Sequence, residues 1–235
     1  MKTFIFHLLL FCFSLPLLAQ RPKVENLRRF EEKPIYFGFT LGLNSGQLTL
    51  DRKTPQIGDS LMGIDVENQS GFNLGIVAAY QMNHSFSLRF VPTLVFTQRN
   101  LDYKFRTVDN SIRMEKTQIE STYLDFPLLL KYRSFRVNNF AAYLIGGLKY
   151  SIDLASNENV LNEDINKTII KLARNSTSAE VGIGTDFFLP YFKFSMEIKM
   201  SYGLHDVLIH DDTYLSKPID KILPRMFVFS LHFEG

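Results

Sequence analysis

Few side chains in this sequence have the type and spacing to do chemistry. The segment HDVLIHDD at residues 205–212 combines imidazole with carboxylate groups, which are donors that divalent cations bind in proteins. Its spacing matches no standard metal site, so we interpret it as a solvated polar loop. Asp125 and Glu180 could pair as general acid and base only if an accessible cleft joined them. We therefore predict no catalytic residue, no metal, no cofactor and no enzyme activity.

The elements that would position these side chains are strands. Residues 192–204 show the pattern best, because every even position from Phe192 to Leu204 is apolar and every odd position is charged, small or polar. Side chains on a strand point to opposite faces with period two, so such a ribbon has one apolar and one polar side. We predict strands at 35–44, 71–81, 86–97, 123–132, 140–150, 179–188, 192–204 and 226–233.

The connections between these strands alternate between long and short. The long ones, rich in Asp, Asn, Ser and Gly, are 45–70, 98–122, 151–178 and 205–225; the short ones are 82–85, 133–139 and 189–191. Bacterial outer-membrane barrels have an even number of strands, short periplasmic turns and longer external loops. We therefore predict an all-β fold: an eight-stranded antiparallel up-and-down transmembrane β-barrel with a polar, side-chain-filled interior, in the cell outer membrane, with both termini periplasmic.

A soluble barrel or sandwich would show the same alternation, with its apolar side turned inward. The predicted lipid side, which includes Leu148, Ile183 and Phe229, carries no charged residue. A basic side chain near the middle of a membrane costs about 2 to 4 kcal/mol, so this asymmetry is typical of a membrane barrel. The alternation of loop lengths and the N-terminal signal described next favour the membrane interpretation over the soluble one.

The N-terminus predicts export. Residues 1–19 have the features of a signal peptide: Lys2, an apolar run from Phe4 to Leu18, and Ala19 before the expected cut. An N-terminal membrane anchor is disfavoured, because that run is shorter than the roughly 20 residues of a spanning helix. Residues 20–34 would be a periplasmic N-terminal segment, with a plain solvated linker favoured over a docking segment, and residues 35–235 the outer-membrane β-barrel domain.

The composition of the mature chain limits the functions that it can have. Cys12 would leave with the signal, so no thiol remains for a disulfide, a metal or catalysis. Without Lys2, 25 basic residues face 24 acidic ones, a formal charge of +1 that gives no indication of nucleic acid binding. After Gln20, no run of apolar residues reaches the length of a helical membrane span.

The predicted interior carries nearly balanced charges. An eight-stranded barrel is just wide enough inside for its own side chains, and charges there persist only when they are paired. We therefore favour an ion-pair plug that keeps the barrel closed over a path for protons or ions. The predicted plug comprises Arg89, Asp125, Lys131, Lys149, Glu180, Asp186, Glu197 and Lys199, and Lys193 also lies on this face.

Aromatic residues flank the three short turns. Outer-membrane barrels carry aromatic girdles where the wall meets the lipid headgroups, although strands are also enriched in aromatic residues for other reasons. Phe233 looks like the terminal aromatic residue by which barrel assembly machinery recognises its substrates. The expected partners are therefore outer-membrane lipids and that machinery. The predicted periplasmic girdle is Tyr80, Phe86, Tyr132, Phe140, Phe187, Phe192 and Phe233.

Several segments resemble the PorT family of the Bacteroidetes, called SprT in gliding bacteria. The resemblance rests on IESTYLDFPLLLKYRSFRVNNFAAYLIGGLKYSIDLAS (119–156), KPIYFGFTLGLN (33–44), GFNLGIV (71–77), LRFVPTLVFTQRNLDY (88–103) and GIGTDFFLPYFKFSMEIKMSYGL (182–204). It implies an outer-membrane component or assembly factor of the type IX secretion system, which exports cargo with a C-terminal signal and supports gliding motility where that occurs. Its partners would be other type IX secretion components, and the family has no catalytic residues to carry over.

Two alternatives stay open. The chain could be a general small barrel for adhesion or envelope stability. It could also be an outer-membrane enzyme that modifies lipid or peptide, in which case His205 and His210 would be needed for activity.

Overall fold

The computed structural model describes residues 25–52, 61–68, 70–106, 112–156, 171–209 and 219–235. The predicted signal peptide lies outside these residues. A short 3₁₀ helix, η2 (Arg28–Glu32), precedes ten strands. They are β1 (Ile35–Arg52), β2 (Leu61–Asn68), β3 (Ser70–Gln81), β4 (Phe86–Phe90), β5 (Thr93–Arg106), β6 (Ile112–Arg133), β7 (Phe140–Asp153), β8 (Asn175–Phe188), β9 (Lys193–Gly203) and β10 (Ile219–Glu234).

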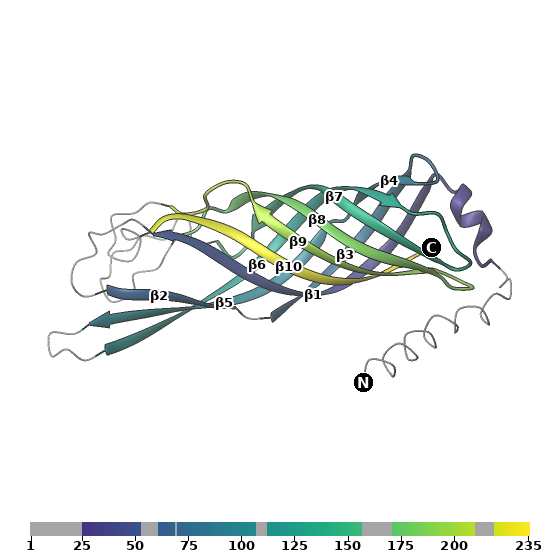
Figure 1. Cartoon of the computed structure of the whole chain (residues 1–235). Coiled ribbons are helices and arrows are strands. Elements are labelled where there is room, and N and C mark those ends of the chain that lie inside the picture. The colour runs from purple at the N-terminus through teal and green to yellow at the C-terminus, as the bar shows by residue number, and fades with distance from the viewer. Residues whose placement is uncertain (1–24, 53–60, 69, 107–111, 157–170, 210–218) are drawn as a thin grey trace, which may run out of the picture.

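The strands close into a barrel (Figure 1). Each strand of the wall pairs antiparallel with its neighbours, in the order β1-β10-β9-β8-β7-β6-β4-β3, and β1 also pairs with β3. That last pairing closes the ring. β4 and β5 follow one another along the same position in the wall, and both pair with β3 and β6. The ring therefore has eight positions, which confirms the predicted all-β, antiparallel, up-and-down barrel.

The predicted strand 86–97 is interrupted at Val91 and Pro92, where β4 ends and β5 begins. Proline has no N–H to donate to a ladder, so it breaks regular pairing inside a sheet. The neighbouring strands still hold this point, because Ile76 N donates to Pro92 O at 3.0 Å and Val91 N donates to Pro127 O at 3.3 Å. The wall is therefore continuous across the interruption.

The prediction that 45–70 and 98–122 are long loops is wrong. β1 continues to Arg52, β2 lies within the first of these ranges, and β5 and β6 pair from Thr93–Asp125 out to Arg106–Ile112. β2 adds to the edge of β5, so a three-stranded ribbon extends past the barrel wall (Figure 1). The alternation that identifies a strand arises from one apolar and one polar surface. The segment 101–105, in which Leu, Tyr and Phe alternate with Asp and Lys, shows that strand-like alternation continues into the ribbon.

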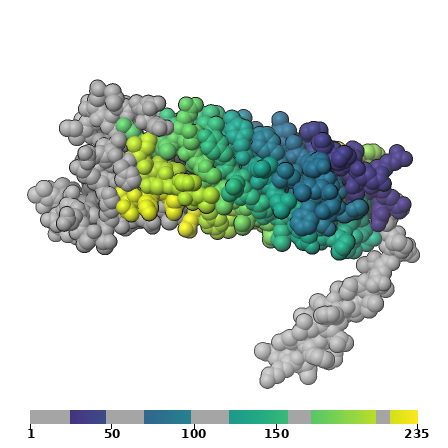
Figure 2. All heavy atoms as spheres, turned by 90° about the horizontal axis from the view of Figure 1, so that it is seen from above, coloured from purple at the N-terminus to yellow at the C-terminus, as the bar shows by residue number. Residues whose placement is uncertain are grey.

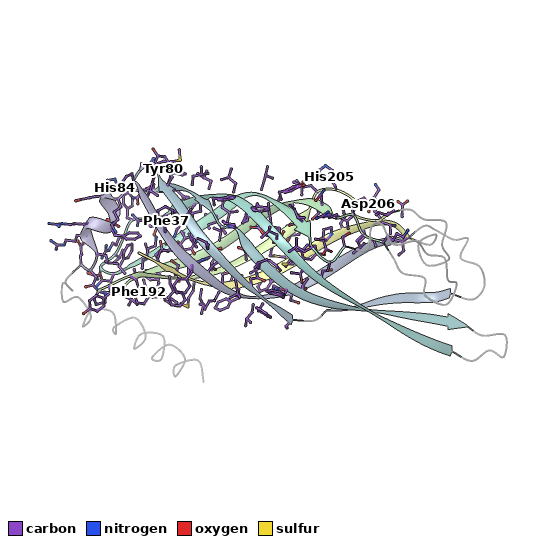
Figure 3. All side chains as sticks on the ribbon, turned by 180° about the vertical axis from the view of Figure 1, so that it is seen from behind. Phe37, Tyr80, His84, Phe192, His205 and Asp206 are labelled. Carbon is purple, nitrogen blue, oxygen red and sulfur yellow. The ribbon has the colours of Figure 1, made fainter. Side chains whose placement is uncertain are left out.

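The two faces of the wall differ in polarity as the alternation predicts. Every residue that we assigned to the lipid side is exposed or half-buried in the isolated chain, including Leu148 at 57% and Ile183 at 59%. The inward side holds the buried charges, such as Arg89 at 0% and Glu197 at 1%. Figure 3 shows side chains standing out all along the barrel, with Phe37 and Phe192 toward one end. A soluble barrel would have the opposite arrangement.

The two ends of the barrel are also different. η2, the C-terminus and β4 lie at one end, and the β5–β6 ribbon leaves from the other (Figure 1). Figure 2 shows the same cylinder from above, with the residues around η2 gathered over the end where η2 lies. We call these the capped end and the loop end. None of the helical segments among the described residues has the length and apolarity to cross a bilayer.

Candidate functional site

Arg89 is the centre of a buried charge network near the capped end. It projects inward from β4, and its guanidinium lies 2.8 Å from Glu197 Oε2 on β9 and 3.2 Å from Glu234 Oε1 on β10. Glu197 also accepts a hydrogen bond of 2.9 Å from Tyr143 Oη. His232 Nε2 lies 3.3 Å from the same carboxylate oxygen. One arginine thus bridges two carboxylates across the barrel, and all five side chains are buried.

Lys131 and Lys193 extend this network. Lys131 Nζ lies 2.8 Å from both carboxylate oxygens of Asp186 and 3.6 Å from the ring centroid of Tyr143. Asp186 also accepts a hydrogen bond of 2.6 Å from Ser195 Oγ. Lys193 pairs with Glu234. The Glu234 carboxylate therefore has two cationic partners, Arg89 and Lys193.

Gly184 makes room for Tyr143 in this interior. The two residues lie opposite each other on β8 and β7, and a Cβ atom at Gly184 would collide with the tyrosine ring. An alanine at this position would therefore force the ring out of its place above Lys131.

A second group of charges lies closer to the loop end. Lys149 Nζ is 3.1 Å from Asp125 Oδ2 and 3.5 Å from Glu180 Oε1. Lys199 Nζ is 3.1 Å from Glu180 Oε2. The inward face of β9 carries Lys193, Glu197 and Lys199. This strand therefore places charges from the capped end toward the loop end.

The structure brings every residue of the predicted plug into an ion pair with an opposite charge. Charges in a narrow interior are costly unless they are paired, so these contacts are the arrangement that a closed lumen requires. The predicted plug did not include Glu234, Tyr143 or His232. The period of β10 could have found two of them, because Val228, Ser230, His232 and Glu234 continue the inward face.

The segment before β1 covers the capped end. Phe30 of η2 is buried in a cluster with Tyr36, Ala79, Ala141 and Phe188. The ammonium of Lys193 lies 4.7 Å from the centroid of the Phe30 ring and 4.1 Å from that of Tyr36, which are cation–π distances. The apolar cap around Phe30 and the charged interior therefore meet at Lys193.

Polar contacts fasten this cap to the turns. Asn26 Nδ2 donates to Phe188 O at 3.0 Å, and Gln81 Nε2 donates to Glu31 O at 3.1 Å. Glu31 lies 3.1 Å from the guanidinium of Arg133 and 3.9 Å from that of Arg136. Burial lowers the pKa of Arg136, and the nearby Glu31 carboxylate partly opposes this shift. The favoured interpretation of 20–34 as a solvated linker is wrong for its described part, which is docked.

The predicted girdle residues lie on the outer surface: six flank the three short turns, and Phe233 lies near the end of β10. The rings of Phe86 and Tyr132 are tilted against each other with centroids 5.0 Å apart, and Phe140 meets Phe187 edge to face at 5.4 Å. Tyr80 is 53% exposed and lies at the same end of the barrel as His84 (Figure 3). Phe192 and Phe233 are 5.9 Å apart.

Two further aromatic residues join this group. Phe233 stacks on Phe39 at 4.8 Å and contacts Phe194 at 5.3 Å, and Phe194 lies 6.3 Å from Phe187. The rings on the neighbouring strands β1, β10, β9, β8 and β7 thus form a continuous row. Whether this row meets lipid headgroups stays a prediction.

The histidine segment supplies no catalytic or metal-binding geometry in its described part. His205 is exposed, and Asp206 accepts hydrogen bonds of 2.9 Å from the backbone N–H groups of Leu208 and Ile222. Both lie at the loop end (Figure 3). Residues 210–212 lie outside the described chain. Within the residues that the structure describes, no cluster of three or more His, Cys, Asp or Glu side chains could hold a metal ion.

An apolar outer surface, a charged interior and a closed ring define the class of this protein. Exposed apolar surface on this scale marks a surface that meets another apolar phase, and only helices and closed barrels satisfy their backbone groups inside a membrane. The chain is therefore a small membrane-type β-barrel. It belongs to the outer membrane protein beta-barrel domain family, whose model matches residues 18–208.

Solved structures of small outer-membrane proteins are similar to this chain. OprG from Pseudomonas aeruginosa has 16% identity, with 85% of this chain and 92% of that chain covered and a TM-score of 0.46. Neisserial surface protein A has 12% identity, coverage of 86% and 97%, and a TM-score of 0.43. Ail from Yersinia pestis has 15% identity, coverage of 86% and 100%, and a TM-score of 0.37. A comparison with curated proteins finds no match.

Proposed function

We propose that this protein is a closed outer-membrane barrel that acts through protein contacts at its ends and loops, and not by passing solutes. The observation that carries this proposal is the interior, where Arg89 links Glu197 and Glu234 across the lumen. An eight-stranded barrel has little room beyond its own side chains, and here they are charged and mutually paired. Phe30 adds an apolar cover at the capped end. Such an interior supports a plug.

The system that it serves, in this proposal, is type IX secretion. The support is the resemblance to the PorT and SprT family. In this proposal the capped end, with η2, the C-terminus and the short turns, faces the periplasm. There it would meet other type IX components, and Phe233 would serve recognition by the barrel assembly machinery.

Deleting the gene tests the secretion role. We expect cargo that bears the C-terminal type IX signal to accumulate in the periplasm and to be lost from the cell surface and the medium. Immunoblots of periplasmic, outer-membrane and medium fractions would measure this, with a strain complemented by the intact gene as the control. Normal export in the deletion strain would refute the secretion role and leave the closed barrel standing.

A role at the cell surface is the second candidate, because the ribbon of β2, β5 and β6 extends past the barrel wall. A projecting ribbon with a strand edge suits contact with other surfaces. In this case the deletion strain would export cargo normally but would lose adhesion or envelope integrity, which attachment and detergent-sensitivity assays would measure.

A further inference from the structure

The outward face of β10 changes from apolar to cationic toward the loop end. The outward side chains of this strand are, in order, Phe233, Leu231, Phe229, Phe227 and Arg225. Phe227 is 45% exposed in the isolated chain, and Arg225 is exposed as well. A cation on the lipid side is costly in the middle of a membrane, so the depth of Arg225 decides what it can contact.

The height of Arg225 follows from the geometry of the wall. A strand rises about 3.4 Å per residue and barrel strands tilt by about 40°, so Arg225 lies about 20 Å from Phe233 along the barrel axis. Phe233 belongs to the aromatic row at the capped end. The apolar band of an outer-membrane barrel is about 25 Å tall between its two aromatic girdles. Arg225 therefore lies near the opposite boundary of the hydrocarbon, at the level of lipid headgroups.

The register around the wall agrees with this position. A path across the paired strands from Ile35 on β1 returns to β1 at Ser45, which is nearer the loop end. Each step from β7 through β8 and β9 to β10 therefore moves toward the loop end. These steps lead from Leu148 to Arg225. Arg225 is thus closer to the loop end than Leu148 on the apolar outer surface.

A groove on the outer surface contains this cation. It crosses β1, β10 and β9 and has a volume of about 300 Å³, which is the lower limit for ligand sites. The Tyr202–Arg225 pair lies on its loop side, and the Met200–Phe227 pair lies on the side toward the middle of the membrane. No acidic side chain of the described chain lines it. One side of the groove therefore suits an anion, and the other suits an alkyl chain.

The polar groups of the groove have few protein partners. The guanidinium of Arg225 lies 5.7 Å from the centroid of the Tyr202 ring, and none of the described carboxylates forms an ion pair with it. Tyr202 Oη donates to Met200 Sδ at 3.5 Å, and a thioether is a weak acceptor. Both side chains can therefore donate to a ligand. A guanidinium matches the geometry of phosphate through two parallel hydrogen bonds.

We propose that this groove is a binding site for an anionic, phosphate-bearing lipid. The phosphate accepts hydrogen bonds from Arg225 and Tyr202, and the first part of an acyl chain packs on Met200 and Phe227. The ligand is a lipid and not free phosphate, because the apolar pair continues the groove toward the middle of the membrane. The proposal does not depend on the secretion role. An arginine that only anchors the barrel at the headgroups would show no preference for an anionic phosphate.

Native mass spectrometry of the full chain in detergent micelles tests this proposal. The probes are dioleoyl phosphatidic acid, dioleoyl phosphatidylcholine and dioleoylglycerol, which share their acyl chains, and inorganic phosphate. We expect phosphatidic acid to bind about tenfold more tightly than the other two lipids, since the glycerol lipid has no phosphate and choline offsets the charge of the other. Inorganic phosphate at the same concentration should not displace phosphatidic acid.

Three variants and one control locate the site. Arg225→Gln should lower the affinity for phosphatidic acid about tenfold, because a hydrogen bond to a charged group is lost. Arg225→Lys keeps the positive charge and should retain most of the preference. Tyr202→Phe removes one neutral donor and should weaken binding about threefold. Arg29→Gln is the matched control, because Arg29 is an exposed arginine of η2 at the capped end, and it should bind as the native protein does.

Equal affinities for the three lipids, or displacement of phosphatidic acid by inorganic phosphate at the same concentration, would overturn this proposal. Unchanged binding in Arg225→Gln would do the same, as would an equal loss in Arg225→Gln and Arg29→Gln. A gel-mobility assay with and without boiling would confirm that each variant is folded. If Arg225→Gln does not fold, Tyr202→Phe decides the outcome, and unchanged binding of phosphatidic acid in that variant would refute the site.

Discussion

Replacing Arg89 by methionine should lower the free energy of unfolding by about 3–5 kcal/mol, the loss typical of a broken buried ion pair. Methionine fills similar space but removes the charge that lies 2.8 Å from Glu197 and 3.2 Å from Glu234. Both carboxylates would stay buried with fewer cations to balance them. Urea unfolding of the barrel in lipid vesicles, followed by circular dichroism, would measure the loss.

Lys199→Met provides the comparison for this prediction. Lys199 is only half-buried, and Lys149 still lies 3.5 Å from Glu180 when Lys199 is replaced. We expect a clearly smaller loss of stability in that variant. If Arg89→Met cost less than about 1 kcal/mol, as exposed ion pairs do, the interior would be hydrated and the plug would be the wrong description.

The second large effect is expected on the outer surface. Leu148→Arg should destabilise the barrel in a bilayer by about 2–4 kcal/mol, the cost of a basic side chain near the membrane midplane. Leu148 is 57% exposed in the isolated chain, and its neighbours across the sheet are Leu128 and Ala179. The new guanidinium would thus be surrounded by apolar side chains and lipid. The fraction of protein that refolds into vesicles across a urea series would measure the effect.

Val137→Arg is the control for the outer surface. Val137 is 67% exposed, but it lies in the turn between β6 and β7, beyond the expected hydrocarbon region. Because substitutions at water-exposed positions usually change stability by less than about 0.5 kcal/mol, we expect little effect there. Equal losses in the two variants would contradict a lipid-facing position for Leu148.

The wall of the barrel could be predicted from the sequence because its two faces meet different surroundings, an apolar one outside and a charged one inside. Apolar residues alternate with polar ones wherever a strand separates lipid from the interior, as in residues 192–204. The same alternation separates inward charges from outward apolar residues. It therefore predicts which side chains meet, but not which carboxylate pairs with which cation, because pairing depends on the register between strands.

Other features could not be predicted, for local physical reasons. The ribbon of β2, β5 and β6 lies in ranges rich in Asp, Asn, Ser and Gly, a composition typical of loops, so its backbone pairing was not predicted. The break at Pro92 is an exception, because proline lacks a backbone N–H and the sequence itself contained this signal. Phe30 lies in a charge-rich stretch, and only the tertiary structure shows the apolar pocket of Tyr36 and Phe188 that receives it.

Fluorescence from a single tryptophan tests the central claim, that the apolar side of the wall faces lipid, most directly. The sequence contains no tryptophan, so Leu148→Trp and Val137→Trp each carry one reporter. In vesicles of lipids with brominated acyl chains, we predict strong quenching at position 148 and weak quenching at position 137. Iodide in the water should show the reverse order. Strong quenching by iodide at position 148, with none by the brominated lipids, would contradict the account.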